Sequence, residues 1–205
     1  MRGGGQQSRK CVNEVFYKIM KRILDVVYVA VSALLLCVPM LVIATLIKLT
    51  SQGPVLHWSL RIGKDNRTFK MPKFRTMHVD APAVATHLLE NPLKYLTPVG
   101  RFLRRFSLDE FPQLWSVLKG DMSLVGPRPA LYNQDDLIEL RTINGLHMII
   151  PGITGWAQVN GRDNLDIPQK VEYDEYYMNH RSFVFDLKIL FLTLVKVLRS
   201  EDIHH

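Results

Sequence analysis

An uncharged apolar run constrains the fold of this chain more than any other feature. It extends from Val26 to Ile47 and contains no charged residue. As a helix, these 22 residues would be ~33 Å long, close to the ~30 Å hydrocarbon core of a bilayer. A secretory signal would have a shorter apolar core followed by a small-residue cleavage site, and neither is present. We therefore expect a membrane-embedded helix that the protein retains.

A proline lies well inside this run. Pro39 leaves the carbonyl oxygen of Leu35 without its helical hydrogen bond. In lipid that oxygen needs another partner, so we expect the helix to kink or to turn back. Lysine and arginine residues flank the run on both sides, which suits a re-entrant hairpin with both ends in the cytoplasm. On these residues alone we still favour a kinked span, because kinked spanning helices are common.

The rest of the chain alternates short extended and helical segments. Turn residues within Ser51–Met77 predict a small hairpin whose second strand lies near Lys73 to Met77. The expected fold is helix-rich α/β (α+β), with a mobile tail at 1–11, a membrane helix at 12–48 and one compact module at 49–205. Helices are predicted over Asp80–Glu90, Val99–Phe106, Ala130–Asn144 and Tyr173–His180, and an interfacial or core-packed helix is predicted from Phe183 to Ser200.

An adjacent acid pair, Asp109 and Glu110, lies between an arginine cluster and a Gly/Pro-rich turn. Taken alone, the sequence from Ser107 to Glu110 is more typical of a capping box that begins a helix ending at Gly120. The positive end of the helix dipole would then lower the pKa of both carboxyl groups. The surroundings favour a chemical role, because carboxylates among guanidinium groups suit phosphoryl transfer.

Basic residues near the acid pair are candidates for phosphate binding. Arg128 stands between Pro127 and Pro129, whose fixed φ angles stiffen the backbone and hold the guanidinium in place. The alternatives are a plain turn at Arg128 and a basic surface that faces solvent or lipid headgroups. The other candidates are Lys73, Arg75, Arg101 and Arg104.

The sequence disfavours several kinds of site. Two cysteines, Cys11 and Cys37, are too few for a disulfide framework or a cysteine zinc site. The glycines form no Walker or dinucleotide-binding motif, and the histidines show no metal-ligand spacing. Magnesium held by Asp109, Glu110 and substrate phosphates is the metal that the residues favour. The net charge of +7 suits anionic lipid, phosphorylated substrates and nucleic acid equally well.

Four ordered motifs stand out in the chain. They are KRILD at 21–25, RIGKDNRTFKMPKFRTM at 61–77, GRFLRRFSLDEFPQLWSVLKGDMSLVGPRP at 100–129 and PGITGWAQVNGRD at 151–163. Together they closely resemble the bacterial sugar transferase family, whose members are monotopic polyprenyl-phosphate phosphoglycosyl transferases. The resemblance extends from about Lys21 to Leu198, and the chain is similar in size to the minimal catalytic form of the family.

The resemblance implies a re-entrant membrane helix, broken at Pro39, that holds a cytosolic catalytic module with interfacial amphipathic helices. Many small members have serine before this proline, whereas this chain has Val38. The module would lie on the cytoplasmic face of the bacterial inner membrane. The implied reaction transfers a phosphosugar from a UDP-sugar to undecaprenyl phosphate and releases UMP, with Mg²⁺ as cofactor. Asp109 would be the nucleophile and Glu110 its partner.

The resemblance leaves several questions open. Trp156 and Gln158 either approach the nucleotide or only pack in the core. The sugar is expected to be an N-acetylated hexosamine or a deoxy derivative, and the pathway to be O-antigen, capsule or protein glycan synthesis. No nucleic-acid partner is expected, and a homodimer remains open. The alternative functions are a magnesium-dependent membrane phosphohydrolase and a non-catalytic protein that binds anionic lipid.

Overall fold

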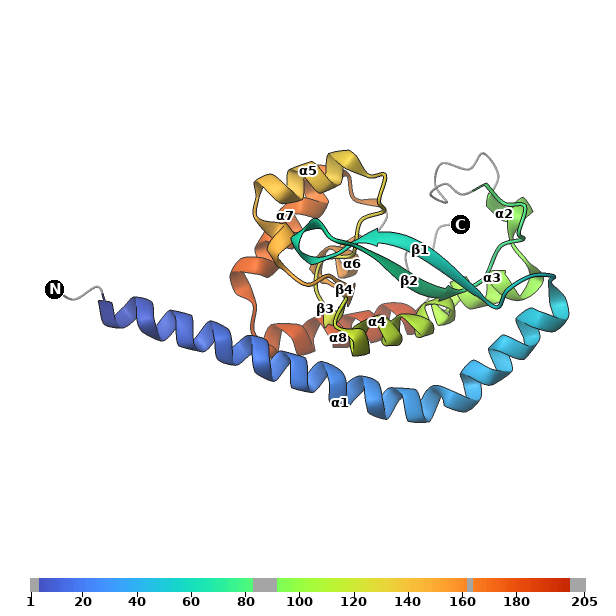
Figure 1. Ribbon diagram of the computed structural model, residues 1–205, viewed down its shortest axis with the longest axis horizontal. Helices are drawn as coiled ribbons and strands as arrows, with labels where there is room; N and C mark the ends of the chain where they lie inside the picture. Colours follow the sequence, from blue (N-terminus) through green and yellow to red (C-terminus); the bar gives the residue numbers. More distant parts are fainter. Residues whose placement is uncertain (1–3, 83–91, 162–163, 200–205) are drawn as a thin grey trace.

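The computed structural model describes residues 4–82, 92–161 and 164–199. Its longest element is helix α1 (Gly4–Thr50), and the other elements gather along its concave side (Figure 1). The helix bends part-way along its length (Figure 1), and Pro39 lies inside it. Proline removes one helical hydrogen bond and is a common cause of such bends. The chain therefore bends within α1 without leaving the helical conformation, and a re-entrant path through a membrane stays a prediction.

One face of α1 packs against the module and the rest of its apolar surface is exposed. Within the described chain, Glu14–Thr50 is the helix that is long and apolar enough to cross a membrane. Val29, Ile43 and Ile47 are buried against the module. By contrast, Leu34 is 80% exposed. A helix with so much uncovered apolar surface is suited to a lipid environment.

The KRILD motif anchors α1 to the module through polar contacts. The Asp25 carboxylate accepts hydrogen bonds from Ser123 Oγ at 2.7 Å and from the backbone N–H of Leu124 at 3.3 Å. Lys21 Nζ lies 2.6 Å from Asp186 Oδ2 on the C-terminal helix. Buried polar groups need such partners, so these contacts fix where α1 meets the module.

The predicted hairpin is present, but its second strand lies at Thr68–Phe74 and not near Lys73 to Met77. Strands β1 (Leu56–Ile62) and β2 (Thr68–Phe74) pair antiparallel, with His57 opposite Lys73. They are joined through the short helix η1 (Lys64–Asn66), where Asp65 and Asn66 have positive φ angles that these residue types tolerate. Because β2 ends at Phe74, the residues from Arg75 onward leave the strand.

A second, parallel pair of short strands lies in the core. Strand β3 (Ser123–Val125) pairs with β4 (Gly152–Thr154), and Ser123 lies opposite Gly152. A Cβ atom at Gly126 would lie 2.6 Å from the carbonyl oxygen of Ile150, so only glycine allows the backbones to approach this closely. The buried side chains of Tyr177 and Ile189 cover this pair from the last two helices.

Short helices surround the two strand pairs (Figure 1). The helices predicted over Val99–Phe106, Ala130–Asn144, Tyr173–His180 and the C-terminal segment are all present with shifted ends, whereas the helix predicted over Asp80–Glu90 falls largely outside the described residues. Their bounds are α2 (Pro92–Tyr95), α3 (Pro98–Arg105), η3 (Leu108–Gln113), α4 (Leu114–Lys119), α5 (Asp135–Ile143), η4 (Leu146–Met148), α6 (Trp156–Val159), α7 (Ile167–His180) and α8 (Phe183–Arg199).

Candidate active site

The acid pair lies in the first turn of η3, and this turn differs from the predicted capping box. Ser107 precedes it in the left-handed conformation, with φ 54°, and its side chain makes no capping hydrogen bond. The backbone N–H of Glu110 instead donates to the carbonyl oxygen of Ser107 at 3.2 Å. The capping-box prediction is therefore wrong, because a tight 3₁₀ turn satisfies this N–H with backbone alone. The predicted helix end at Gly120 is confirmed.

Glu110 is held by cations from two other elements. Arg128 Nη2 donates to Glu110 Oε1 at 2.8 Å, and Lys73 Nζ lies 3.5 Å from the same oxygen. Lys73 comes from β2 and Arg128 from the loop after β3, so the fold brings together residues far apart in sequence. A largely buried carboxylate is stable when it is paired in this way.

Asp109 occupies a different environment from its neighbour. Its side chain is buried, and burial is the main reason why the pKa of Asp109 is raised, with the negative charge of Glu110 adding to the shift. Within the described residues, no hydrogen-bond donor contacts its carboxylate. The prediction that a helix dipole lowers this pKa is wrong, because desolvation outweighs the dipole of one short turn. Nearby positive charges that oppose the shift belong to Lys73, Arg104 and Arg128.

Arg104 faces the acid pair from α3. Its Nε donates to Thr76 Oγ1 at 2.9 Å, which fixes the guanidinium, and its charge acts on Asp109. The helix itself begins at Thr97, whose Oγ1 accepts from the backbone N–H of Gly100 at 2.9 Å. Arg101 is on the same helix but is exposed. The structure therefore brings Arg104 to the pair and leaves Arg101 at the surface.

The Arg75 guanidinium lies beside the C-terminal end of α1, where both of its terminal nitrogens donate hydrogen bonds and its buried Nε has no partner in the described chain. Its Nη2 donates to the carbonyl oxygen and the hydroxyl of Ser51, at 3.0 and 2.7 Å, and its Nη1 donates to the carbonyl oxygen of Gln52. Gly53 follows with φ +110°, and a Cβ atom there would overlap this guanidinium. These contacts hold the two residues that follow α1, so they give Arg75 a structural role.

Trp156 packs within an aromatic cluster. Its ring centroid lies 6.0 Å from that of Tyr176 and 4.9 Å from that of Phe185, and Lys188 Nζ lies 5.3 Å from it. These contacts support the packing alternative for Trp156. Both amide atoms of Gln158 are buried, and neither has a hydrogen-bond partner in the described chain. A contact of either residue with a nucleotide stays a prediction.

Two residues of β1 belong beside the site and were not singled out from the sequence. His57 lies opposite Lys73 in the hairpin, and partial desolvation together with the charges of Lys73 and Arg61 lowers the pKa of His57. Arg61 Nη1 donates to the carbonyl oxygen of Pro129 at 3.2 Å. The alternation of side chains along a strand could have placed both residues on the face that carries Lys73.

The carboxylate pair fits magnesium only if the substrate supplies further ligands. Within the described residues, no group of three His, Cys, Asp or Glu side chains could hold a metal ion. Magnesium is commonly bound by one or two carboxylates together with substrate phosphates and water. Asp109 and Glu110 are consistent with that kind of site.

Comparisons with known proteins agree on one family. A family model described as "Bacterial sugar transferase" matches residues 16–200. The chain is 42% identical over 187 residues to the "Uncharacterized sugar transferase EpsL" of Bacillus subtilis (strain 168), with 90% of each chain covered. It is also 42% identical over 189 residues to the "UDP-glucose:undecaprenyl-phosphate glucose-1-phosphate transferase" of Escherichia coli (strain K12), covering 87% of this chain and 40% of that protein.

A third relative has a name that states a different sugar. It is the "UDP-N-acetylgalactosamine-undecaprenyl-phosphate N-acetylgalactosaminephosphotransferase" of Aeromonas hydrophila, 38% identical over 188 residues. The match covers 89% of this chain and 44% of that protein. The chain thus spans most of the Bacillus relative and less than half of these two relatives with named reactions.

Proposed function

This chain belongs to the bacterial sugar transferase family, and on that premise we propose that it transfers a phosphosugar from a UDP-sugar to undecaprenyl phosphate. The observation that carries the proposal is the buried Asp109–Glu110 pair among cations from three separate parts of the fold. Both substrates are phosphate anions, so a site that joins them must neutralise several negative charges at once. Lys73, Arg104 and Arg128 are placed to do so.

In the first half-reaction, an Asp109 carboxylate oxygen attacks the β-phosphorus of the UDP-sugar. A phosphorus–oxygen bond to Asp109 forms, and the bond from that phosphorus to the bridging oxygen breaks, so UMP leaves with the bonding electrons. The absence of a hydrogen-bond donor on the Asp109 carboxylate within the described residues supports this role. An oxygen that donors do not hold keeps its lone pairs for attack.

In the second half-reaction, a phosphate oxygen of undecaprenyl phosphate attacks the same phosphorus. The bond to Asp109 breaks, which regenerates the carboxylate and leaves the sugar on an undecaprenyl diphosphate. Glu110 holds Arg128 and Lys73 beside the reacting phosphate in both steps. Its role in the proposal is therefore to position cations and to help bind metal.

Magnesium is the cofactor that the carboxylates suit. Asp109 and Glu110 would hold it together with the donor's phosphates, and it would neutralise charge that builds up on the phosphate oxygens. Arg104 and Arg128 supply fixed positive charge at the same place. The two arginines and the metal would thus offset the same repulsion between the negative charges that meet in the site.

The acceptor's position explains why the site is joined to an apolar helix. The phosphate of undecaprenyl phosphate lies at the membrane surface, whereas a UDP-sugar is soluble, so the site must lie at the interface. We place the module on the cytoplasmic face of the bacterial inner membrane, with α1 following a re-entrant path. The exposed apolar side chains of α1 and α8 support this location; those on α8 are Val184, Leu187, Phe191 and Leu194.

The proposed donor carries an N-acetylated hexosamine or a deoxy derivative. The named relatives act on UDP-glucose or on UDP-N-acetylgalactosamine, so related chains differ in the sugar. A screen should therefore begin with UDP-N-acetylgalactosamine, UDP-N-acetylglucosamine and UDP-glucose. The product would enter the synthesis of a glycoconjugate such as O-antigen, capsule or protein glycan.

The test is product analysis with the full chain in lipid nanodiscs that contain undecaprenyl phosphate. We expect one UDP-sugar to give UMP and an equal amount of lipid-linked sugar, and Asp109→Asn to give neither. Asp136→Asn, which alters an exposed acid on α5, should behave like the wild type. Free sugar phosphate in the absence of lipid acceptor would identify a phosphohydrolase instead. Lipid binding without any nucleotide product would identify a non-catalytic protein.

A further inference from the structure

Four consecutive carbonyl groups in the loop after β3 each accept a hydrogen bond. The loop begins at Gly126 and Pro127 and continues through Arg128. Because successive carbonyl groups are hydrogen-bonded, its backbone is fixed at successive residues. Two of the four donors are arginine side chains, from Arg61 and Arg141. The donors and distances are Gly152 N to Pro127 O at 2.9 Å, Arg141 Nη1 to Arg128 O at 2.8 Å, Arg61 Nη1 to Pro129 O at 3.2 Å and Ile62 N to Ala130 O at 3.0 Å.

Arg141 reaches the loop from α5 and is itself held by α7. Its Nε and Nη2 donate to Asp174 Oδ2 at 3.1 and 2.6 Å, and the Asp174 side chain is 1% exposed. The carboxylate thus fixes one edge of the planar guanidinium and leaves Nη1 directed at the carbonyl oxygen of Arg128. A lysine has one ammonium group and no planar fork, so it could not keep all three contacts.

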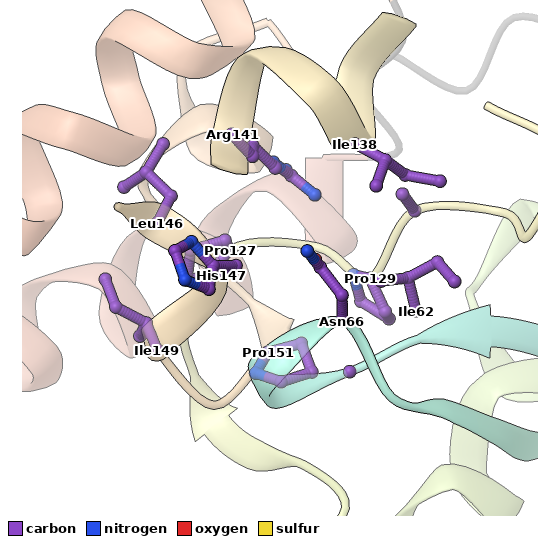
Figure 2. A pocket seen from close by; sticks show the side chains of 12 residues that line it. Ile62, Asn66, Pro127, Pro129, Ile138, Arg141, Leu146, His147, Ile149 and Pro151 are labelled. Atoms are coloured by element: carbon purple, nitrogen blue, oxygen red, sulfur yellow. The ribbon is translucent and has the colours of Figure 1, made fainter. Parts of the chain in front are cut away.

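Packing alone does not hold the loop at this point. Arg141, Pro127 and Pro129 line a small cavity together with side chains from η4 (Figure 2). Its volume is about 30 Å³, enough for roughly one water molecule. Because there is space beside the loop, the hydrogen bond from Arg141 is the contact that holds the carbonyl group of Arg128 itself, between the neighbouring carbonyl groups that Gly152 and Arg61 hold.

We propose that Arg141, held by Asp174, is a positioning residue that sets where the Arg128 guanidinium meets Glu110 and the phosphate of the substrate. Two proline rings restrict the backbone on either side of Arg128, so a fixed carbonyl group also fixes the direction of its side chain. A chain of contacts thus joins Asp174 on α7 to Arg141 on α5, and through Arg128 to Glu110. The inference rests on the proposed function, which gives Arg128 a substrate to meet.

The test needs a variant that removes the contact without leaving a buried charge alone. Replacing only Arg141 or only Asp174 would strand its partner and unfold a fraction of the protein. The double variant Arg141→Met/Asp174→Leu replaces both charges with apolar groups and is expected to keep the fold. It removes the hydrogen bond to the carbonyl oxygen of Arg128. Thermal unfolding checks that the variant is folded.

A double-mutant cycle with Arg128→Lys then separates positioning from general structure. UMP release gives kcat and KM, and binding of Mg²⁺–UDP gives a second readout that needs no turnover. In the wild-type background, we expect the double variant to lower kcat/KM roughly tenfold and to weaken UDP binding. In the Arg128→Lys background, it should cause little further loss, because the residue through which Arg141 acts is already altered.

The outcomes that overturn the two proposals are distinct. An equal loss of kcat/KM in both backgrounds, or no loss in the wild-type background, would show that Arg141 and Asp174 do not act through Arg128. The proposed function would still stand in that case, because the wild type releases UMP. A wild-type protein that releases no UMP from any UDP-sugar would overturn the proposed function and the positioning role together.

Discussion

Arg128 Nη2 donates a hydrogen bond to Oε1 of Glu110, 18 positions earlier in the sequence, at 2.8 Å. Lys73 contacts the same carboxylate oxygen. The two adjacent acids therefore lie in different environments. Glu110 is neutralised by its neighbours, whereas Asp109 is buried without a hydrogen-bond donor among the described residues. This difference supports different roles for the two acids and leads to the following predictions.

Asp109→Asn should stabilise the fold while removing activity. Burial and the charge of Glu110 raise the pKa of Asp109 above its ordinary value of 3.8. At a pH between the ordinary pKa and the raised pKa of Asp109, the folded protein therefore binds more protons than the unfolded chain. Its free energy of unfolding falls as the pH rises through that range. Asparagine removes this slope. Thermal unfolding in magnesium-free buffer, as a function of pH, measures it, and an unchanged slope in the variant would contradict the assignment.

Lys73→Arg should extend activity to higher pH. Burial lowers the pKa of Lys73 below its ordinary value of 10.5, although Glu110 opposes the shift. The ammonium charge is therefore lost at a lower pH than in an exposed lysine, and activity should fall with it. An arginine stays charged over this range. The control is Lys70→Arg, at an exposed position opposite Leu60 in the hairpin. An alkaline limb that does not move in Lys73→Arg would contradict the role of this charge.

Two neighbouring arginines should differ sharply in their effect on activity. Arg104 is fixed by Thr76 and acts on Asp109, whereas Arg105 is exposed and lies over the ring of Phe106. Arg104→Gln should lower kcat/KM by about 10²-fold or more, in the range found for a lost transition-state donor. Arg105→Gln should remain within about threefold of the wild type. Steady-state kinetics of UMP release compares them, and equal effects would argue against a specific role for Arg104.

Arg75→Met should lower stability rather than substrate affinity. It removes the hydrogen bonds to Ser51 and Gln52, the two residues that follow α1. A loss of about 2–4 kcal/mol in the free energy of unfolding is expected when buried carbonyl groups lose a charged donor. The folded fraction should keep the wild-type KM for the donor. A variant with wild-type stability but a raised KM would contradict the structural role and indicate that Arg75 binds substrate. Arg101→Met is the exposed control, with an expected change within about 0.5 kcal/mol.

Local patterns were enough to predict the long elements. The apolar run with Pro39 gave a bent helix, and turn residues gave the β1–β2 hairpin. These features depend on composition and spacing within a few turns of chain. The acid pair could be found for the same reason, because its neighbours in sequence are unusual.

Tertiary contacts decided what local patterns could not. The pKa of Asp109 depends on burial by other elements, and Ser107 adopts a left-handed conformation that its residue type does not require. Strand alternation would place Lys73 and Arg75 on one face, but β2 ends between them and separates their roles. The pairing of Arg141 with Asp174 joins two helices that no local pattern connects.

Covalent trapping tests the central claim most directly. The full chain in nanodiscs without undecaprenyl phosphate is mixed with Mg²⁺ and a UDP-sugar labelled at the β-phosphorus. We expect up to one sugar phosphate per protein on the peptide that contains Asp109, accompanied by UMP and discharged when undecaprenyl phosphate is added. Asp136→Asn should be labelled in the same way and Asp109→Asn should not. Lipid-linked product formed by the wild type without any label on the protein, or label retained in Asp109→Asn, would contradict the account.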